Sequence, residues 1–136
     1  MLRRLFKNGG KENSLSIDFS NSILYNKGEM KMQKITGRTA SMGKKIVGSA
    51  CMANGKDTVM TADGILVAEM TDPSLLSFMA KSKAVVTSTG GLLCHAAIVC
   101  RELGIPCVVA AKNVHKLVKQ GSIITVDPAD GSVTIH

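Results

Sequence analysis

The chain has 136 residues, of which 45% are hydrophobic, with three Phe, one Tyr and no Trp. This length suits one domain with a sizeable core, and no apolar run in the sequence is long enough to span a membrane. The few aromatic side chains argue against a surface that stacks the bases of single-stranded nucleic acid. We expect a cytoplasmic protein, because residues 1–7 are basic but lack the apolar stretch of a secretory signal.

The net charge of +7 is concentrated near the N-terminus. Residues 1–45 contain ten basic and three acidic side chains, whereas residues 46–136 contain seven of each. Charge runs commonly do no more than solvate a surface, so we favour a solvated tail over binding to nucleic acid or an anionic surface. Salt-sensitive binding of DNA or RNA that disappears when residues 1–34 are deleted would support the second interpretation.

Residues 14–25 alternate apolar and polar side chains as a half-buried strand does, and residues 23–25 are a second candidate strand. From residue 35 onward, short apolar runs are separated by Gly, Asn and Asp, which indicates strands joined by turns. The predicted strands of this part are residues 46–53, 59–61 and 65–68. We therefore divide the chain into a basic extension, residues 1–34, partly flexible or with added strands, and a domain, residues 35–136.

The second half of the chain alternates strands and helices. Pro73 suits the first position of a helix that ends near Lys81, with Thr71 or Asp72 as the N-cap. The remaining predicted elements are a strand at Ala84–Thr87, a glycine-bearing turn at residues 88–93, a helix at His95–Leu103, a strand at residues 107–111, a short helix from its cap Asn113 to Leu117, and a hairpin of residues 122–127 and 132–135. This order predicts a mixed α/β fold, with small mixed sheets covered by a few helices on one side.

His95 stands where a predicted helix begins, directly after the Gly90-Gly91 turn. The N-terminus of a helix presents unpaired N–H groups and the positive end of the helix dipole, so it suits a phosphate. A neutral imidazole is also a good nucleophile near pH 7. The pattern therefore predicts that His95 accepts a phosphoryl group, and a buried structural histidine is the alternative interpretation.

The cysteines form no C-x-x-C pair, and three of them lie in predicted strand or helix interiors; they are Cys51, Cys94, Cys100 and Cys107. We expect reduced, mostly buried thiols rather than disulfides. Cys94 is adjacent to His95, but Cys100 lies one and a half turns further along the helix, so these side chains do not converge on a zinc ion. We expect no bound metal, and we expect His115 to be solvated on its short polar helix.

The run from Thr87 to Pro106 resembles the signature of the mobile, phosphohistidine-carrying domain of the phosphoenolpyruvate (PEP)-utilising enzymes, which include PEP synthase, pyruvate phosphate dikinase and enzyme I of the sugar phosphotransferase system. The matching pattern is T-x-x-G-G-x-x-C-H-A-A-I-V-x-R-E-L-G-I-P. Flanking segments agree in order at residues 37–43, 63–73 and 121–133. The resemblance therefore covers about residues 35–136.

This resemblance implies a swivelling, three-layer β/β/α domain whose histidine, here His95, carries a phosphoryl group on Nε2. It also implies that Thr87 orients the His95 ring through a hydrogen bond, and that Gly90, Gly91 and Cys94 form the phosphate site. The family usually has serine where this chain has Cys94, and threonine is common at the position of Leu93.

Arg101 follows His95 by six positions, which places it about 240° around the helix axis. This placement favours a structural ion pair or a docking contact over direct binding of the phosphate.

We predict a phosphoryl carrier that passes phosphate between separate donor and acceptor proteins of the PEP synthase type. This length has no room for a nucleotide site or a barrel with metal ligands, so Mg²⁺ and ATP or PEP are expected only on separate nucleotide-binding and PEP/pyruvate-binding proteins. The alternative is a regulatory or partner-binding module that keeps the swivelling fold without transfer. A partner captured equally well by wild type and His95→Ala would favour that alternative.

Overall fold

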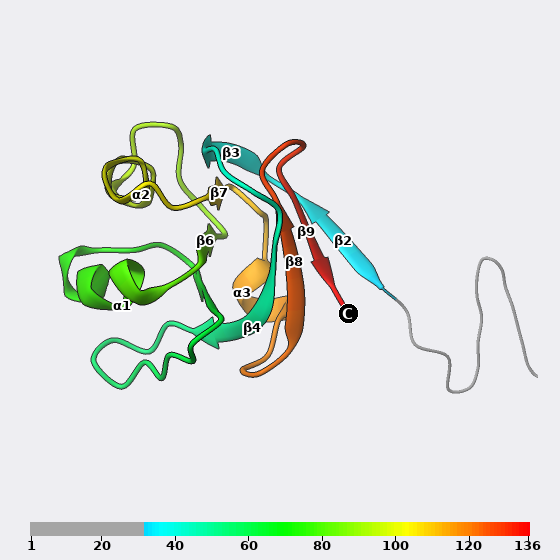
Figure 1. Ribbon diagram of the computed structural model, residues 1–136, viewed down its shortest axis with the longest axis horizontal. Coiled ribbons are helices and arrows are strands. Elements are labelled where there is room, and N and C mark those ends of the chain that lie inside the picture. Colours follow the sequence, from blue (N-terminus) through cyan, green and yellow to red (C-terminus); the bar gives the residue numbers. More distant parts are fainter. Residues whose placement is uncertain (1–31) are drawn as a thin grey trace, which may run out of the picture. The chain divides into compact units, whose positions relative to one another are not determined.

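Figure 1 shows the computed structural model, which describes residues 32–136, with Lys34–Ile135 as one unit. The strands predicted in residues 14–25 lie outside the described residues. Eight strands of the described part form one mixed sheet in the order β2-β9-β8-β4-β5-β6-β7-β3. Their bounds are β2 Gln33–Thr36, β3 Arg38–Ser41, β4 Ile46–Met52, β5 Gly64–Ala68, β6 Ala84–Thr87, β7 Cys107–Val109, β8 Ile123–Asp127 and β9 Ser132–Ile135.

The centre of the sheet is parallel and its flanks are antiparallel. Strands β4, β5, β6 and β7 run parallel, whereas β8, β9 and β3 each pair antiparallel with their neighbours. Every residue of β5 and β6 is buried, because both faces of these strands are covered. The predicted mixed α/β class is confirmed.

The two faces of the central strands have different covers. Leu66 and Val85 pack toward α1 (Leu76–Lys81) and α2 (His95–Leu103), which lie together on one side in Figure 1. Ile65 and the alternate residues of the same strands pack against β8, β9 and α3 (Val114–Leu117). The two longer helices thus share one face as predicted, while the single turn of α3 lies on the other.

Gly37 joins the two edges of the sheet. Strands β2 and β3 occupy opposite edges, yet Gly37 is the only residue between them, so the sheet folds back on itself. The Gly37 N–H donates to the carbonyl of Gly131 at 2.8 Å. A Cβ at Gly37 would lie 2.5 Å from the carbonyl oxygen of Val109, so the crossing requires glycine.

The helix before β6 begins as predicted but with a tighter first turn. Pro73–Leu75 form the 3₁₀ turn η2, and α1 continues to Lys81. Of the two predicted caps, Asp72 makes the contact, since its carboxylate accepts the N–H of Ser74 at 2.8 Å. The hydroxyl of Thr71 is therefore available for another partner.

Helix α2 has the predicted bounds because its end signals are local. Gly104 is left-handed, with a φ of 70°, and the N–H of Ile105 donates to the carbonyl of Cys100 at 2.9 Å. No helix among residues 32–136 has the length and apolar character needed to cross a membrane.

Two predictions of secondary structure are wrong. Residues 59–61 form no strand, and Val59 is 64% exposed in the connection between β4 and β5. The strand predicted at residues 107–111 ends at Val109, because Ala110 has a positive φ of 56° and turns the chain toward α3. Both errors come from short apolar runs, which do not define a strand without a pairing partner.

Candidate functional site

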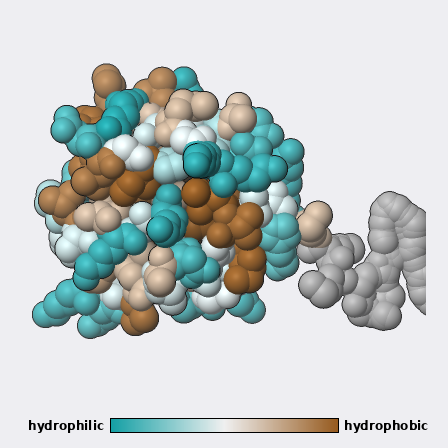
Figure 2. Space-filling model, in the orientation of Figure 1, coloured by the Kyte–Doolittle hydropathy of each residue, from teal (hydrophilic) through white to brown (hydrophobic). Residues whose placement is uncertain are grey.

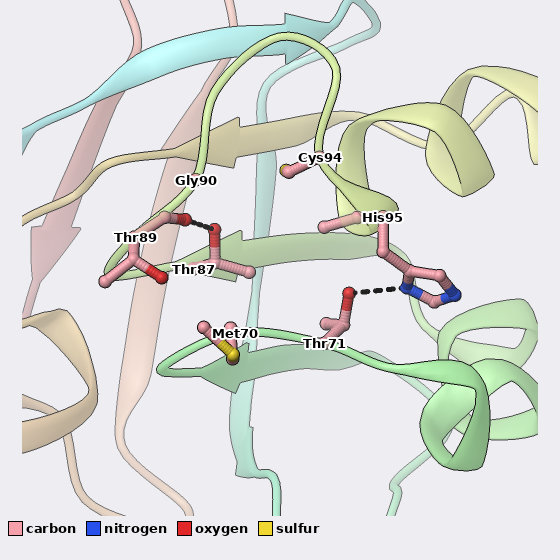
Figure 3. A pocket seen from close by; sticks show the side chains of 8 residues that line it. Met70, Thr71, Thr87, Thr89, Gly90, Cys94 and His95 are labelled. Atoms are coloured by element: carbon pink, nitrogen blue, oxygen red, sulfur yellow. Dashed lines mark hydrogen bonds between the residues drawn. The ribbon is translucent and has the colours of Figure 1, made fainter.

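A cavity of about 200 Å³ lies at the carboxyl ends of β5 and β6 (Figure 3). Two loops enclose it: the segment that follows β5 and the glycine turn that follows β6. The N–H and the hydroxyl of Thr89 both donate to the carbonyl of Glu69, at 3.1 and 3.0 Å, and hold these loops together. The lining residues are Met70, Thr71, Thr87, Thr89, Gly90, Cys94, His95 and Ala96.

His95 is the first residue of α2 and is half-buried at the cavity. Its Nδ1 lies 2.9 Å from Oγ1 of Thr71. Figure 3 shows the other ring nitrogen, Nε2, on the side of the imidazole away from Thr71. In the tautomer that carries its proton on Nδ1, the ring donates to Thr71 and keeps a free lone pair on Nε2.

Thr87 does not make the contact with His95 that was predicted for it. Its hydroxyl donates to the carbonyl of Thr89 at 2.7 Å, and its side chain is almost fully buried. The geometry of the turn explains this, since Thr87 ends β6 and closes the first bend of the loop with its own side chain. In this structure Thr71 contacts the ring in its place.

The two glycines of the turn differ in their surroundings. Gly90 has a φ of 113°, and a Cβ there would lie 2.8 Å from the sulfur of Cys94. Gly91 has no atom within 4 Å of the position of an added Cβ. A side chain at position 90 would therefore strain the backbone and clash with the thiol, whereas one at position 91 would enter open space.

Cys94 occupies the N-cap position of α2, and its side chain accepts no hydrogen bond from the helix. Its half-buried thiol lines the cavity beside Gly90 (Figure 3). The first N–H groups of α2 are thus not capped by this side chain. They form the end of the helix that carries partial positive charge. The predicted phosphate-site residues Gly90, Cys94 and His95 lie at one cavity, and Gly91 adjoins it in the turn.

Arg101 lies outside the cavity lining and holds the glycine turn through a hydrogen bond to its backbone. Its Nε donates to the carbonyl of Ala40 at 2.9 Å, and its Nη2 donates to the carbonyl of Leu92. These bonds connect the glycine turn to the end of β3. The guanidinium is therefore bound to main-chain oxygens, and Arg101 is not among the residues that line the cavity.

The cavity has little charge of its own. No Lys or Arg is among its lining residues. The exposed carboxyl of Asp72 lies beside it, and hydrogen bonds from the Ser74 side chain and backbone hold the pKa of Asp72 below its usual value, with a smaller contribution from His95. A phosphoryl group bound here would meet hydroxyls and a helix terminus rather than side-chain cations.

Three of the four thiols are buried, as expected. Cys100 and Cys107 contact each other between α2 and β7, and this hydrogen bond together with burial raises the pKa of Cys107 above its usual value. Cys107 therefore stays protonated. Within residues 32–136, no three side chains of His, Cys, Asp or Glu are grouped as metal ligands.

His115 is not simply solvated, in contrast to the prediction. Its Nδ1 contacts the hydroxyl of Ser88, and its backbone N–H donates to the same oxygen at 3.1 Å. Ser88 is buried at the start of the glycine turn, on the side of β6 that faces α3. Sequence spacing did not indicate this pair, since 27 positions separate the two residues.

The fold and this site define a class of protein that the sequence comparison also identifies. Residues 60–131 match the family described as PEP-utilising enzyme, mobile domain, and the chain belongs to that family.

Among its relatives, the phosphoenolpyruvate synthase of Neisseria meningitidis is 47% identical over 79 residues, which are 58% of this chain and 10% of that protein. The chain spans about a tenth of the length of the curated relatives that it matches. A solution structure of Enzyme I superposes with a TM-score of 0.51 and 30% identity over 62% of this chain and 34% of the other. The aconitase X structure from Thermococcus kodakaraensis shares the fold, with a TM-score of 0.60, 18% identity, and coverage of 76% of this chain and 98% of that one.

Proposed function

We propose that this domain is a phosphoryl carrier that is transiently phosphorylated on Nε2 of His95. The observation that carries the proposal is the contact between Thr71 Oγ1 and His95 Nδ1 at 2.9 Å, at a cavity beside a helix N-terminus. This contact fixes the ring, and we infer the tautomer in which Nδ1 carries the proton and donates to Thr71. The Nε2 lone pair then remains available for attack on phosphorus.

The transfer step needs no metal or nucleotide bound to this domain. The Nε2 lone pair forms a bond to phosphorus while the bond between phosphorus and the donor oxygen breaks, and the donor leaves with that electron pair. Nδ1 keeps its proton against Thr71. In the second step an acceptor oxygen attacks the same phosphorus and Nε2 leaves, which restores the imidazole.

The donor and acceptor sites belong to partner domains or proteins. Its relatives are named phosphoenolpyruvate synthases and are about ten times longer than the matched segment, so we propose that ATP or PEP and Mg²⁺ bind to such partners. The absence of Lys and Arg from the cavity lining supports this division, because the charge of a transferred phosphate has to be balanced elsewhere.

A direct test uses the Neisseria meningitidis phosphoenolpyruvate synthase in which the histidine that aligns with His95 is replaced by alanine. The full chain is incubated with this synthase, PEP and Mg²⁺, and intact-mass spectrometry detects a phosphoryl adduct before and after mild acid. We expect one acid-labile adduct on wild type and none on His95→Ala. Equal labelling of both proteins would contradict the proposal.

One observation favours the alternative of a partner-binding module without transfer. Leu93, which stands where the family commonly has threonine, is exposed beside the cavity, so one hydroxyl that could contact a phosphate is missing. Under this alternative, a partner binds wild type and His95→Ala equally, and neither protein accepts phosphate.

A further inference from the structure

Several exposed side chains near the His95 cavity are apolar, and we call Met70, Leu93 and Ile98 its rim. Leu93 is 84% exposed, Met70 is 64% exposed and Ile98 is 48% exposed. Leu76 and Leu92 are exposed as well. Figure 2 shows hydrophobic surface in the region of α1, α2 and the loop before α2.

Three of these side chains are close to the cavity, either in its lining or next to lining residues in the chain. Met70 precedes Thr71 and lines the cavity itself, and Leu93 immediately precedes the two lining residues at the start of α2. Ile98 lies three positions after His95, which places it on the same side of the helix, one turn further on. Met70 therefore lies at the cavity, and Leu93 and Ile98 flank His95 in the chain and on helix α2.

The rim is apolar, but the group at its centre would be a phosphate. The cavity lining contains no Lys or Arg, and Arg101 is occupied by two backbone carbonyls. The nearby Asp72 is acidic. A partner that fits this surface needs apolar groups that contact the rim. It also needs cations that contact the centre, because phosphorylated His95 is negatively charged.

We propose that Met70, Leu93 and Ile98 form a docking face for the phosphoryl-donor site of a PEP synthase-type protein, and this inference rests on the proposed function. Docking buries the apolar rim and excludes water from the phosphate. Water exclusion strengthens the attraction between the partner's cations and the phosphoryl group. The reacting centre is thereby completed only when the two proteins meet.

The test measures docking and chemistry separately. Docking is measured as the concentration of the alanine-substituted Neisseria synthase that gives half the maximal rate of adduct formation with PEP. Chemistry is measured with phosphoramidate, a small phosphoryl donor that needs no docking face. The variants are Leu93→Ala and Ile98→Ala, which remove apolar surface without adding charge, and the matched control is Val47→Ala.

Val47 is a suitable control because it is 60% exposed and sits near the amino end of β4. His95 lies by contrast at the carboxyl ends of the parallel strands. We expect Leu93→Ala and Ile98→Ala each to raise the half-saturating synthase concentration by about tenfold, while Val47→Ala leaves it unchanged. All three variants should react with phosphoramidate at the wild-type rate.

Several results would overturn the proposal. If Leu93→Ala and Ile98→Ala behave like Val47→Ala with the synthase, or if they also lose reaction with phosphoramidate, the rim is not a docking face. A wild type that reacts with phosphoramidate but not with the synthase removes the proposed partner and leaves the carrier function intact. A wild type labelled by neither donor overturns both proposals.

A second copy of the chain is the other candidate occupant of this face. Analytical ultracentrifugation distinguishes it. A wild-type dimer that becomes monomeric in Leu93→Ala and Ile98→Ala would assign the face to self-association and overturn docking to the synthase.

Discussion

Two histidines in this domain make the same type of contact in different surroundings. His95 contacts Thr71 through Nδ1, and His115 contacts Ser88 through Nδ1. Both imidazoles are half-buried. The hydroxyl contact by itself therefore does not distinguish a phosphoryl acceptor from a structural histidine.

The surroundings make the difference. His95 begins the nine-residue helix α2 and lines a cavity, whereas His115 lies within the four-residue α3 and is not part of that lining. Ser88 already accepts the backbone N–H of His115, which favours donation of its own proton to Nδ1 and leaves the ring proton on Nε2. An Nε2 that carries a proton has no lone pair for phosphorus.

The largest expected effect tests the two histidines directly. With phosphoramidate as donor, His95→Ala should abolish the acid-labile adduct, and His115→Ala should keep it at the wild-type level. Intact-mass spectrometry after purification of each variant gives the stoichiometry. Loss of the adduct in His115→Ala alone would reverse the assignment of the two residues.

The glycine turn provides the next test, because its two glycines differ in backbone strain. Gly90→Ala places a Cβ at a positive φ and against the thiol of Cys94, so we expect a loss of at least about 1 kcal/mol in the free energy of unfolding. Gly91→Ala meets nothing within 4 Å and should change it by no more than about 0.5 kcal/mol. Urea denaturation measures both values, and equal losses would show that the turn is not specific for Gly90.

The hydroxyls can be compared by removing each one. Thr71→Val keeps the shape of the side chain but removes the partner of Nδ1, and we expect the rate of His95 phosphorylation to fall by about tenfold. Thr71→Ser should restore most of this rate.

Ser88→Ala is the matched change at the other histidine. It should leave the phosphorylation rate unchanged but lower the free energy of unfolding by about 1 kcal/mol, since the N–H of His115 loses its acceptor. A slower phosphorylation in Ser88→Ala, with normal rates in Thr71→Val, would mean that the ring of His95 is held by other groups.

The smallest effect concerns pH. The pKa of Asp72 is lowered in the folded state from its ordinary value of 3.8, chiefly by hydrogen bonds from Ser74. A carboxyl with a lowered folded-state pKa contributes stability above its unfolded pKa, and that contribution is lost as the pH falls through the folded-state pKa. We therefore expect the difference in thermal midpoint between wild type and Asp72→Asn to shrink as the pH falls below about 3.8.

The local parts of this site could be predicted from the sequence. The bounds of α2, the place of His95 at its start and the left-handed Gly104 follow from neighbouring residues. The roles of Gly90, Gly91, Cys94 and Arg101 in phosphate binding or docking stay predictions. The partner of the His95 ring could not be predicted, because Thr71 lies 24 positions away. The sequence offered one signal for this contact, namely the two candidate N-caps. Because Asp72 caps η2, the hydroxyl of Thr71 is available to contact His95.

The sequence alone determined the elements whose signals are local, namely the buried central strands, helix α2 with its C-terminal Gly104, and the C-terminal hairpin. Only the tertiary structure decided which distant residues meet. The pairing of β5 with β6 aligns their carboxyl ends and brings Thr71 to His95, and the crossing at Gly37 places β2 and β3 on opposite edges. The physical reason is that periodicity and caps act within a few residues, whereas sheet pairing and side-chain contacts depend on how the whole chain packs.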